Sequence, residues 1–543
     1  MQEYKKQNYL KGAAILAAAT VFVKVIGAVY KIPIFNVMSD AGIGAFQATY
    51  NIYALVLTIA TAGIPVALSR MVSSASALGH MSLVKRYFSV ALPAFTLIGV
   101  AAMSGMFFFA GTIAGLMNNS LAAPGIRVLA PAVFFACVMA VYRGYTQGFQ
   151  KMGPTAASQV VEVLCKAAFG IAIAFWLSSR NYETAIISAG SITGVTIGMG
   201  LCVPLLIRYK RIQDRSVLPA DIAADGAADA LPSRMGVFAK LMKVSIPITL
   251  GSSFMAIMIV IDNSVVNGRL QSGLGLSEYD ASALYGLYTR ALTVYNFPSA
   301  LVVPVSISIM PAIAAALAKR ENQEAVGIMQ SSVKLVNLLA LPAAAGIMAL
   351  AGPIMISLYN DPAPVTAAIL TILGAASFFV CFQLITTAIL QANGHERLAM
   401  ISFPVGGVIK ITINYFLVAI PEIGIIGPSV GTLTCFFVIS AMNICFIIAK
   451  VKNRPKFRIL FAKPLLCTIL MAVSAFGAYG LIYRFGSALI GTSRAAMSVF
   501  LGLSIMIAVF VYGVLVIVTR TVTREDMKLL PKGEKLANML KIR

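Results

Sequence analysis

Charged residues are scarce in this sequence, and acidic ones are the scarcest. Only 11% of the 543 residues are Asp, Glu, Lys or Arg, and Asp and Glu together number 19. A soluble domain has about 25% charged residues, so the composition excludes an ordinary water-soluble enzyme. The seven cysteines lie in apolar runs without CxxC spacing, which argues against a disulfide framework and a metal site. The HExxH, P-loop and GxSxG signatures of enzymes are also missing.

Long apolar runs make up most of the chain. Hydrophobic residues account for 59% of it, and the mean hydropathy is +0.88. A membrane span needs about 20 apolar residues, so the chain has room for about 14 spans. We therefore predict an all-α polytopic membrane protein. The predicted spans are residues 10–35, 43–69, 87–116, 125–149, 156–178, 184–208, 241–266, 281–313, 332–358, 364–392, 397–420, 424–449, 459–483 and 495–518.

The spans form two lobes of six helices, followed by two more helices. The first lobe is residues 1–208, and the second is 241–450. Between them, 209–240 is a polar stretch that reads as a cytoplasmic linker. Residues 451–518 hold the last two spans, and 519–543 form a basic cytoplasmic tail.

The excess of positive charge is a topology signal. Lys and Arg number 42, which gives a net charge of +23. Our span assignment puts about 32 of these residues on one side and about 5 on the other, which identifies the first side as cytoplasmic. Both termini are expected on that side. We therefore expect no nucleic-acid partner, and the predicted location is a bacterial cytoplasmic membrane.

The two lobes repeat one another in sequence. Gln147 and Gln391 begin similar cytoplasmic turns at an offset of about 244 residues, and the same offset carries Lys166 onto Lys410. Each lobe has an even number of spans, so the repeats have the same membrane orientation. This pattern predicts a pseudo-two-fold parallel repeat with a substrate site at the lobe interface.

Basic residues inside the spans are the first candidates for a binding site. A charge at the middle of a membrane helix costs about 2.5–3.5 kcal/mol. Lys24 and Lys31 are seven residues apart, which in a continuous helix places them on nearly one face, about 10 Å apart. Two ammonium groups so placed can bind one anion, although snorkelling to the interface is the alternative. Arg290 lies deep in its span, and its planar fork suits a phosphate. Lys410 is the fourth candidate.

Acidic residues near these bases are candidates for charge pairing. Asp262 lies at a depth similar to that of Arg290, and it could neutralise Arg290 in an empty site or form a purely structural pair with it. Glu162 and Lys166 have the i, i+4 spacing of a self-neutralising pair. Lys410 has Gly406 where Lys166 has an acid, so Lys410 is the better cavity candidate.

Asp40 and Arg143 are further candidates for charge pairing or gating, and each also has an ordinary explanation. Asp40 is expected in the first external connection, where it could pair with Arg127 or remain a solvated loop acid. Arg143 lies at a cytoplasmic helix end, where a positive residue is expected from topology alone.

The stretch from Tyr142 to Lys166 resembles a signature of bacterial polysaccharide-biosynthesis membrane proteins. It reads Tyr-Arg-Gly-Tyr-Thr-Gln-Gly-Phe-Gln-Lys-Met-Gly-Pro-Thr-Ala-Ala-Ser-Gln and continues through Glu162. Segments 22–31, 63–70 and 288–304 agree with this resemblance, which is strongest to lipid II flippases and the stage V sporulation protein B branch.

The resemblance implies a multidrug/oligosaccharidyl-lipid/polysaccharide exporter fold with a central cationic cavity for a lipid-linked pyrophosphate sugar. It also implies that the base at Lys24 and the arginine at Arg290 serve that cavity. The last two helices would supply a groove for the isoprenoid tail.

We therefore expect a flippase that carries an undecaprenyl-pyrophosphate-linked saccharide to the outer leaflet by alternating access, with roles in peptidoglycan synthesis, cell shape or sporulation. It would act as a monomer, without a catalytic role or a cofactor, and could contact cell-envelope synthesis proteins. The membrane potential is expected to drive its return, and coupling to Na⁺ or H⁺ stays open. Two alternatives also remain open: a cation-coupled multidrug exporter, and a non-transporting scaffold for envelope synthesis.

Overall fold

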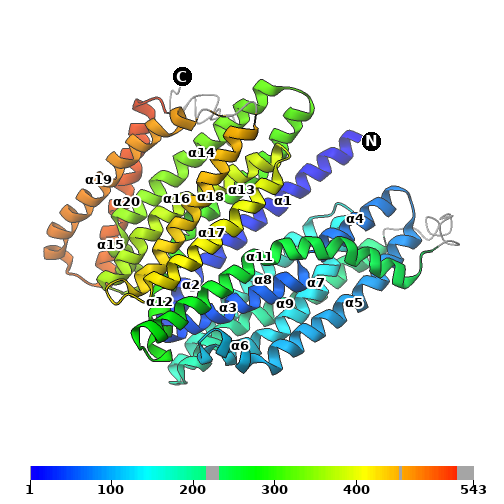
Figure 1. Ribbon diagram of the computed structural model, residues 1–543, viewed down its shortest axis with the longest axis horizontal. Helices are drawn as coiled ribbons and strands as arrows, with labels where there is room; N and C mark the ends of the chain where they lie inside the picture. The colour runs from blue at the N-terminus through cyan, green and yellow to red at the C-terminus, as the bar shows by residue number, and fades with distance from the viewer. Residues whose placement is uncertain (1, 216–230, 452–454, 456, 522–543) are drawn as a thin grey trace. The chain divides into compact units, whose positions relative to one another are not determined.

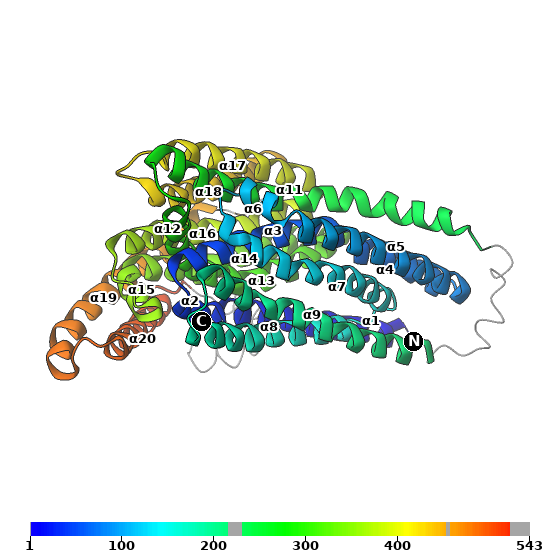
Figure 2. The same cartoon turned by 90° about the horizontal axis from the view of Figure 1, so that it is seen from below.

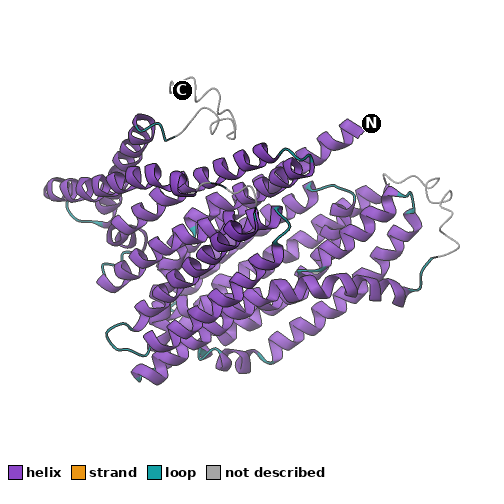
Figure 3. Cartoon of the chain, turned by 45° about the horizontal axis from the view of Figure 1, so that its top comes forward, coloured by secondary structure: helices purple, strands orange, loops and turns teal. Residues whose placement is uncertain are grey.

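The protein is described from a computed structural model, which covers residues 2–215, 231–451, 455 and 457–521 (Figure 1). Every regular element in these ranges is a helix (Figure 3). The predicted all-α fold is therefore confirmed. Residues 216–230 of the predicted linker and nearly all of the predicted basic tail lie outside the described residues.

Contacts divide the chain into two units, residues 1–286 and 287–543. The first unit contains α1 (Gln2–Val29), α2 (Lys31–Val37), α3 (Asp40–Thr61), α4 (Ile64–Ala77), α5 (Met81–Phe108), α6 (Ala110–Leu116), α7 (Ala123–Gly148), α8 (Gly153–Ser179), α9 (Thr184–Arg215) and α11 (Arg234–Leu274). Because α11 packs against α3, the seventh predicted span lies within this unit. The predicted lobe boundaries describe a sequence repeat and stay predictions.

The second unit begins within α12 (Glu278–Tyr295). It continues with α13 (Phe297–Ala318), α14 (Asn322–Ala349), α15 (Ala351–Tyr359), α16 (Pro364–Ala392), α17 (Glu396–Leu417), α18 (Gly427–Lys450), α19 (Phe457–Ile490) and α20 (Arg494–Val518). Its core is formed by α13, α14, α16 and α18, around Val333, Phe382 and Ile447.

Thirteen segments of the described chain are long and apolar enough to cross a membrane. They correspond to thirteen of the predicted spans. The remaining prediction, residues 281–313, corresponds to α12 and α13, two helices that meet at Asn296.

Several helix breaks fall just before a proline. Tyr30 separates α1 from α2 three residues before Pro33, and Asn296 separates α12 from α13 two residues before Pro298. A proline has no backbone N–H, and its ring clashes with the carbonyl four residues earlier. Lys31 therefore directly follows a one-residue turn at Tyr30, whose backbone stays in the right-handed helical region, and Lys24 and Lys31 lie on two consecutive helical segments of one candidate span.

Glycines allow α8 and α9 to run side by side at close range (Figure 1 and Figure 2). A Cβ atom added to Gly194 would lie 2.6 Å from the backbone nitrogen of Gly170 and 2.6 Å from the carbonyl oxygen of Lys166. Small residues of this kind let membrane helices pack backbone to backbone. The crossing fixes the part of α8 that carries Lys166.

Candidate functional site

Lys31, the first residue of α2, faces an aromatic and amide surface of α3. Its Nζ atom donates to Oε1 of Gln47 at 3.5 Å. The same atom lies 6.0 Å from the ring centre of Phe46 and 5.6 Å from that of Tyr50. The Gln47 side chain in turn donates to Asn51 at 2.8 Å. The ammonium group is thus held by ring faces and one amide oxygen, which are neutral partners.

Lys166 reaches the same tyrosine from α8. Its Nζ atom donates to the hydroxyl of Tyr50 at 3.3 Å. It also lies 4.6 Å from the ring centre of Tyr50 and 4.7 Å from that of Tyr30. Tyr50 is therefore shared by the ammonium groups of Lys31 and Lys166. Tyr30 and Tyr50 were not singled out from the sequence, because their role depends on α2, α3 and α8 meeting in space.

Neither of these two ammonium groups has a carboxylate within 4.0 Å in the part of the chain that the structure describes. Lys31 and Lys166 are both half-buried. Two positive charges near one ring repel each other, and cation–π contacts of about 0.5–2 kcal/mol each offset only part of that cost. An anion placed between them would relieve the repulsion. We call Lys31, Lys166, Tyr30, Tyr50 and Gln47 the lysine–tyrosine cluster.

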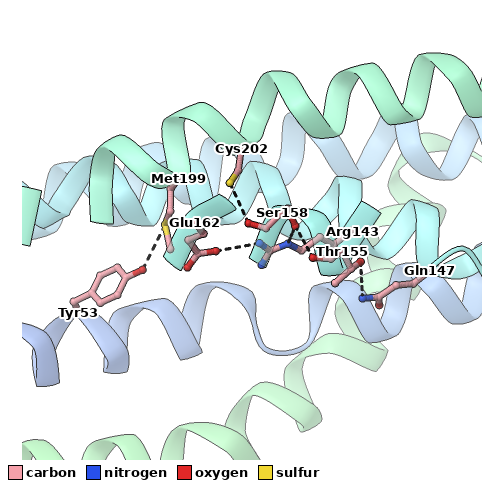
Figure 4. Close-up of polar contacts among 8 residues, drawn as sticks. All are labelled: Tyr53, Arg143, Gln147, Thr155, Ser158, Glu162, Met199 and Cys202. Carbon is pink, nitrogen blue, oxygen red and sulfur yellow. Dashed lines mark hydrogen bonds and ion pairs between the residues drawn. The ribbon is translucent and has the colours of Figure 1, made fainter. Parts of the chain in front are cut away.

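Glu162 pairs with Arg143, and this corrects the predicted pairing with Lys166. The guanidinium of Arg143 donates to the Glu162 carboxylate at 3.1 Å and to the Ser158 hydroxyl at 2.9 Å (Figure 4). Ser158 and Glu162 are four residues apart on α8, so one planar fork from α7 reaches both. Arg143 thus takes the carboxylate that the i, i+4 spacing offered to Lys166.

The other predicted bases have different surroundings. Lys24 is exposed on α1 and has no hydrogen bond or ion pair within the described residues. This exposure fits both predicted roles of Lys24, a base that faces a binding cavity and a base that snorkels to the membrane interface. Lys410 is half-buried on α17. A Cβ atom on Gly406 would lie 2.6 Å from a side-chain carbon of Ile439 on α18, so packing leaves no room there for an acid beside Lys410.

Arg290 belongs to the second unit, where it pairs with Asp361. The two side chains are 3.4 Å apart, and both are largely buried. Asp361 is itself held at the start of α16, because its carboxylate accepts from the backbone N–H of Ala363 and from the Thr366 hydroxyl, each at 3.0 Å. The Arg290 guanidinium also lies 5.8 Å from the ring centre of Tyr359. The sequence reading missed Asp361, whose only signal was an acid in the turn before Pro364.

The remaining predicted acids lie in the first unit. Asp262 is buried on α11, and Asp40 is the first residue of α3. Their predicted roles in pairing and gating stay predictions.

An apolar cavity of about 480 Å³ lies within the second unit. Its walls come from α12, α13, α14, α15, α19 and α20, and they include Leu301, Ile354, Met471 and Val509. Few polar atoms face it. A cavity with this lining suits hydrocarbon chains.

A family model decides the classification of this chain. The model, described as Polysaccharide biosynthesis protein, matches residues 9–317. The chain belongs to the polysaccharide biosynthesis protein family. The match covers the lysine–tyrosine cluster and extends through Arg290.

Curated relatives extend this family likeness to the full chain. The chain is similar to "Uncharacterized membrane protein YabM" of Bacillus subtilis, with 25% identity over 543 residues, which is 99% of this chain and 98% of that one. It is also similar to "Lipid II flippase MurJ" of the same organism, with 26% identity over 482 residues and 86% of each chain covered.

Among solved structures, the lipid II flippase MurJ in an inward closed conformation has the same fold. The TM-score is 0.67 at 16% identity, with 93% of this chain and 98% of that one covered. The family and these neighbours place the protein among multi-pass membrane transporters and flippases rather than enzymes.

Proposed function

We propose that the protein is a flippase that moves an isoprenyl-pyrophosphate-linked saccharide from the cytoplasmic to the outer leaflet by alternating access. The observation that carries this proposal is the lysine–tyrosine cluster. Two half-buried ammonium groups converge on Tyr50 without a carboxylate partner among the described residues. A pyrophosphate would supply the negative charge that these two ammonium groups do not meet among the described residues, and its oxygens accept hydrogen bonds from ammonium groups.

The apolar cavity of the second unit supports the same substrate class. The saccharide lipid has a long hydrocarbon tail, and the walls formed by α14, α19 and α20 are apolar. Burying each methylene group of such a tail contributes about 0.8 kcal/mol. A lipid-linked anion therefore matches both features, whereas a cationic drug matches the apolar cavity and is repelled by the ammonium groups.

Lys31 and Lys166 are our first assignments for pyrophosphate binding. Lys24, Arg290 and Lys410 are further assignments, each tested by its own substitution. A positively charged empty carrier would return with the inside-negative membrane potential, which contributes about 2.3 kcal/mol per charge per 100 mV. Lipid II or a related envelope precursor is the proposed cargo, and a monomer is the proposed working form.

Transport in proteoliposomes tests the proposal. An isoprenyl-pyrophosphate disaccharide with a fluorescent headgroup is incorporated in both leaflets, and a membrane-impermeant reductant then bleaches the outer one. Wild-type protein should make the protected fraction accessible, and Lys31→Met should abolish most of that transfer. Lys151→Met removes an exposed lysine of the α7–α8 turn and should transfer like wild type. Transfer no faster than in protein-free vesicles would overturn the proposal.

A further inference from the structure

The short helix α15 connects the apolar cavity to Arg290. Leu350, the residue just before α15, and Ile354, in its first half, line the cavity. Tyr359, its last residue, lies under the Arg290 guanidinium, and Asp361 follows two residues later as the ion-pair partner of Arg290. The C-terminal end of α15, together with the start of α16 that also holds Asp361, therefore sets where the Arg290 side chain is held.

Arg494 of α20 donates two hydrogen bonds to that end of α15. Its Nε atom donates to the carbonyl oxygen of Ser357 at 3.1 Å, and its Nη2 atom donates to that of Leu358 at 2.6 Å. Both are carbonyls of the last turn of α15, which has no further helical N–H to bind them. A cation at a helix C-terminus also interacts favourably with the helix dipole. Figure 1 and Figure 2 show α15 beside α20, against which it packs.

The turn after α15 is short and hydrogen-bonded, so the carbonyls that Arg494 binds and the Arg290–Asp361 ion pair are expected to move together. Asn360 adopts the left-handed conformation, with φ of 53°, and its N–H donates to the Ile356 carbonyl at 2.9 Å. The N–H of Asp361 donates back to the Met355 carbonyl at 3.4 Å. Displacing Ser357 and Leu358 would thus displace Tyr359 and Asp361 with them.

We propose that Arg494 is a positioning residue for Arg290. By fixing the C-terminal turn of α15, it holds Tyr359 and Asp361 where they present the Arg290 guanidinium. This inference rests on the proposed function, in which Arg290 binds the pyrophosphate. It also connects α20, a wall of the apolar cavity, to Arg290 indirectly, through the C-terminal turn of α15 and Asp361.

Hydrogen exchange of the ligand-free, full-length protein tests whether Arg494 holds the C-terminal turn of α15 in place. Arg494→Ala should speed exchange of the amides of Asn360, Asp361 and Ala363, because the turn that protects them is released. Arg484→Ala removes an exposed arginine of α19 and should leave those amides unchanged. Unchanged exchange in Arg494→Ala would overturn the proposal, whatever the protein binds.

Binding of undecaprenyl pyrophosphate tests the consequence. Arg494→Ala should weaken binding about tenfold, and Arg494→Lys should recover part of the loss because an ammonium also donates to carbonyls. In the Arg290→Ala background, Arg494→Ala should cause no further loss, since both act through one group. Equal losses in both backgrounds would overturn the positioning role. If wild type does not bind at all, the proposed function fails and this role for Arg494 falls with it, even when exchange responds.

Discussion

Replacing Lys166 by methionine separates a binding role from a structural one. The substitution keeps an unbranched side chain on α8 and removes one of the two ammonium groups near Tyr50. A hydrogen bond to a charged group contributes about 1.5–3 kcal/mol. Loss of one ammonium–phosphate contact should therefore weaken undecaprenyl pyrophosphate binding about 10- to 150-fold.

Thermal stability should respond differently. Lys166 has no carboxylate partner among the described residues, so Lys166→Met should not lower the midpoint of thermal unfolding, and relief of repulsion from Lys31 should favour a higher midpoint. Tyr50→Phe keeps the ring beneath both ammonium groups and removes only the accepting hydroxyl. It should weaken binding about fivefold, which corresponds to about 1 kcal/mol.

The assay is titration of the purified protein in nanodiscs with undecaprenyl pyrophosphate, next to a thermal unfolding scan. Lys151→Met serves as the matched lysine control. The reasoning would be refuted if Lys166→Met bound as tightly as wild type. It would also be refuted if binding fell only together with the unfolding midpoint, since Lys166 would then be structural.

Three other predictions follow from the packing and pairing. Arg143→Ala should weaken pyrophosphate binding, because Glu162 becomes free to neutralise Lys166 one turn away. Combining Arg143→Ala with Glu162→Gln should restore binding. A double variant that does not recover binding in the same titration would count against this account. Gly194→Leu should destabilise the α8–α9 crossing by about 1–3 kcal/mol, measured as a lower unfolding midpoint, and an unchanged midpoint would contradict the packing. Ala508→Trp should fill part of the apolar cavity and weaken binding of undecaprenyl pyrophosphate more than that of farnesyl pyrophosphate, which has a shorter tail. Equal effects on the two ligands would show that the cavity does not bind the long tail.

Hydropathy predicts most of this fold because membrane spans are local features. Each needs only a sufficient apolar run, so their order and rough bounds follow from the sequence. The helix breaks at Tyr30 and Asn296 are also local, since Pro33 and Pro298 cause them, but a hydropathy window averages over such positions. The chain at 281–313 therefore reads as one span and folds as two helices.

Pairing between helices depends on which elements meet in space, and local sequence spacing does not specify this. The spacing of Glu162 and Lys166 favours a pair within one helix, but Arg143 of α7 lies nearer the carboxylate in space. Tertiary packing thus outweighs an i, i+4 interaction of about 0.2–0.5 kcal/mol. Asp361 is a similar case, because an acid in a short turn becomes significant only once Arg290 is known to face it.

The central claim is that a cationic site moves a pyrophosphate-linked saccharide, and rescue of a lipid II flippase-depleted bacterium tests it most directly. Surface-exposed lipid II would be measured with wild type, Lys31→Ala and Arg290→Ala at matched membrane levels. We predict that wild type restores surface lipid II and that both variants fail. Restoration by both variants to the wild-type level would contradict the account.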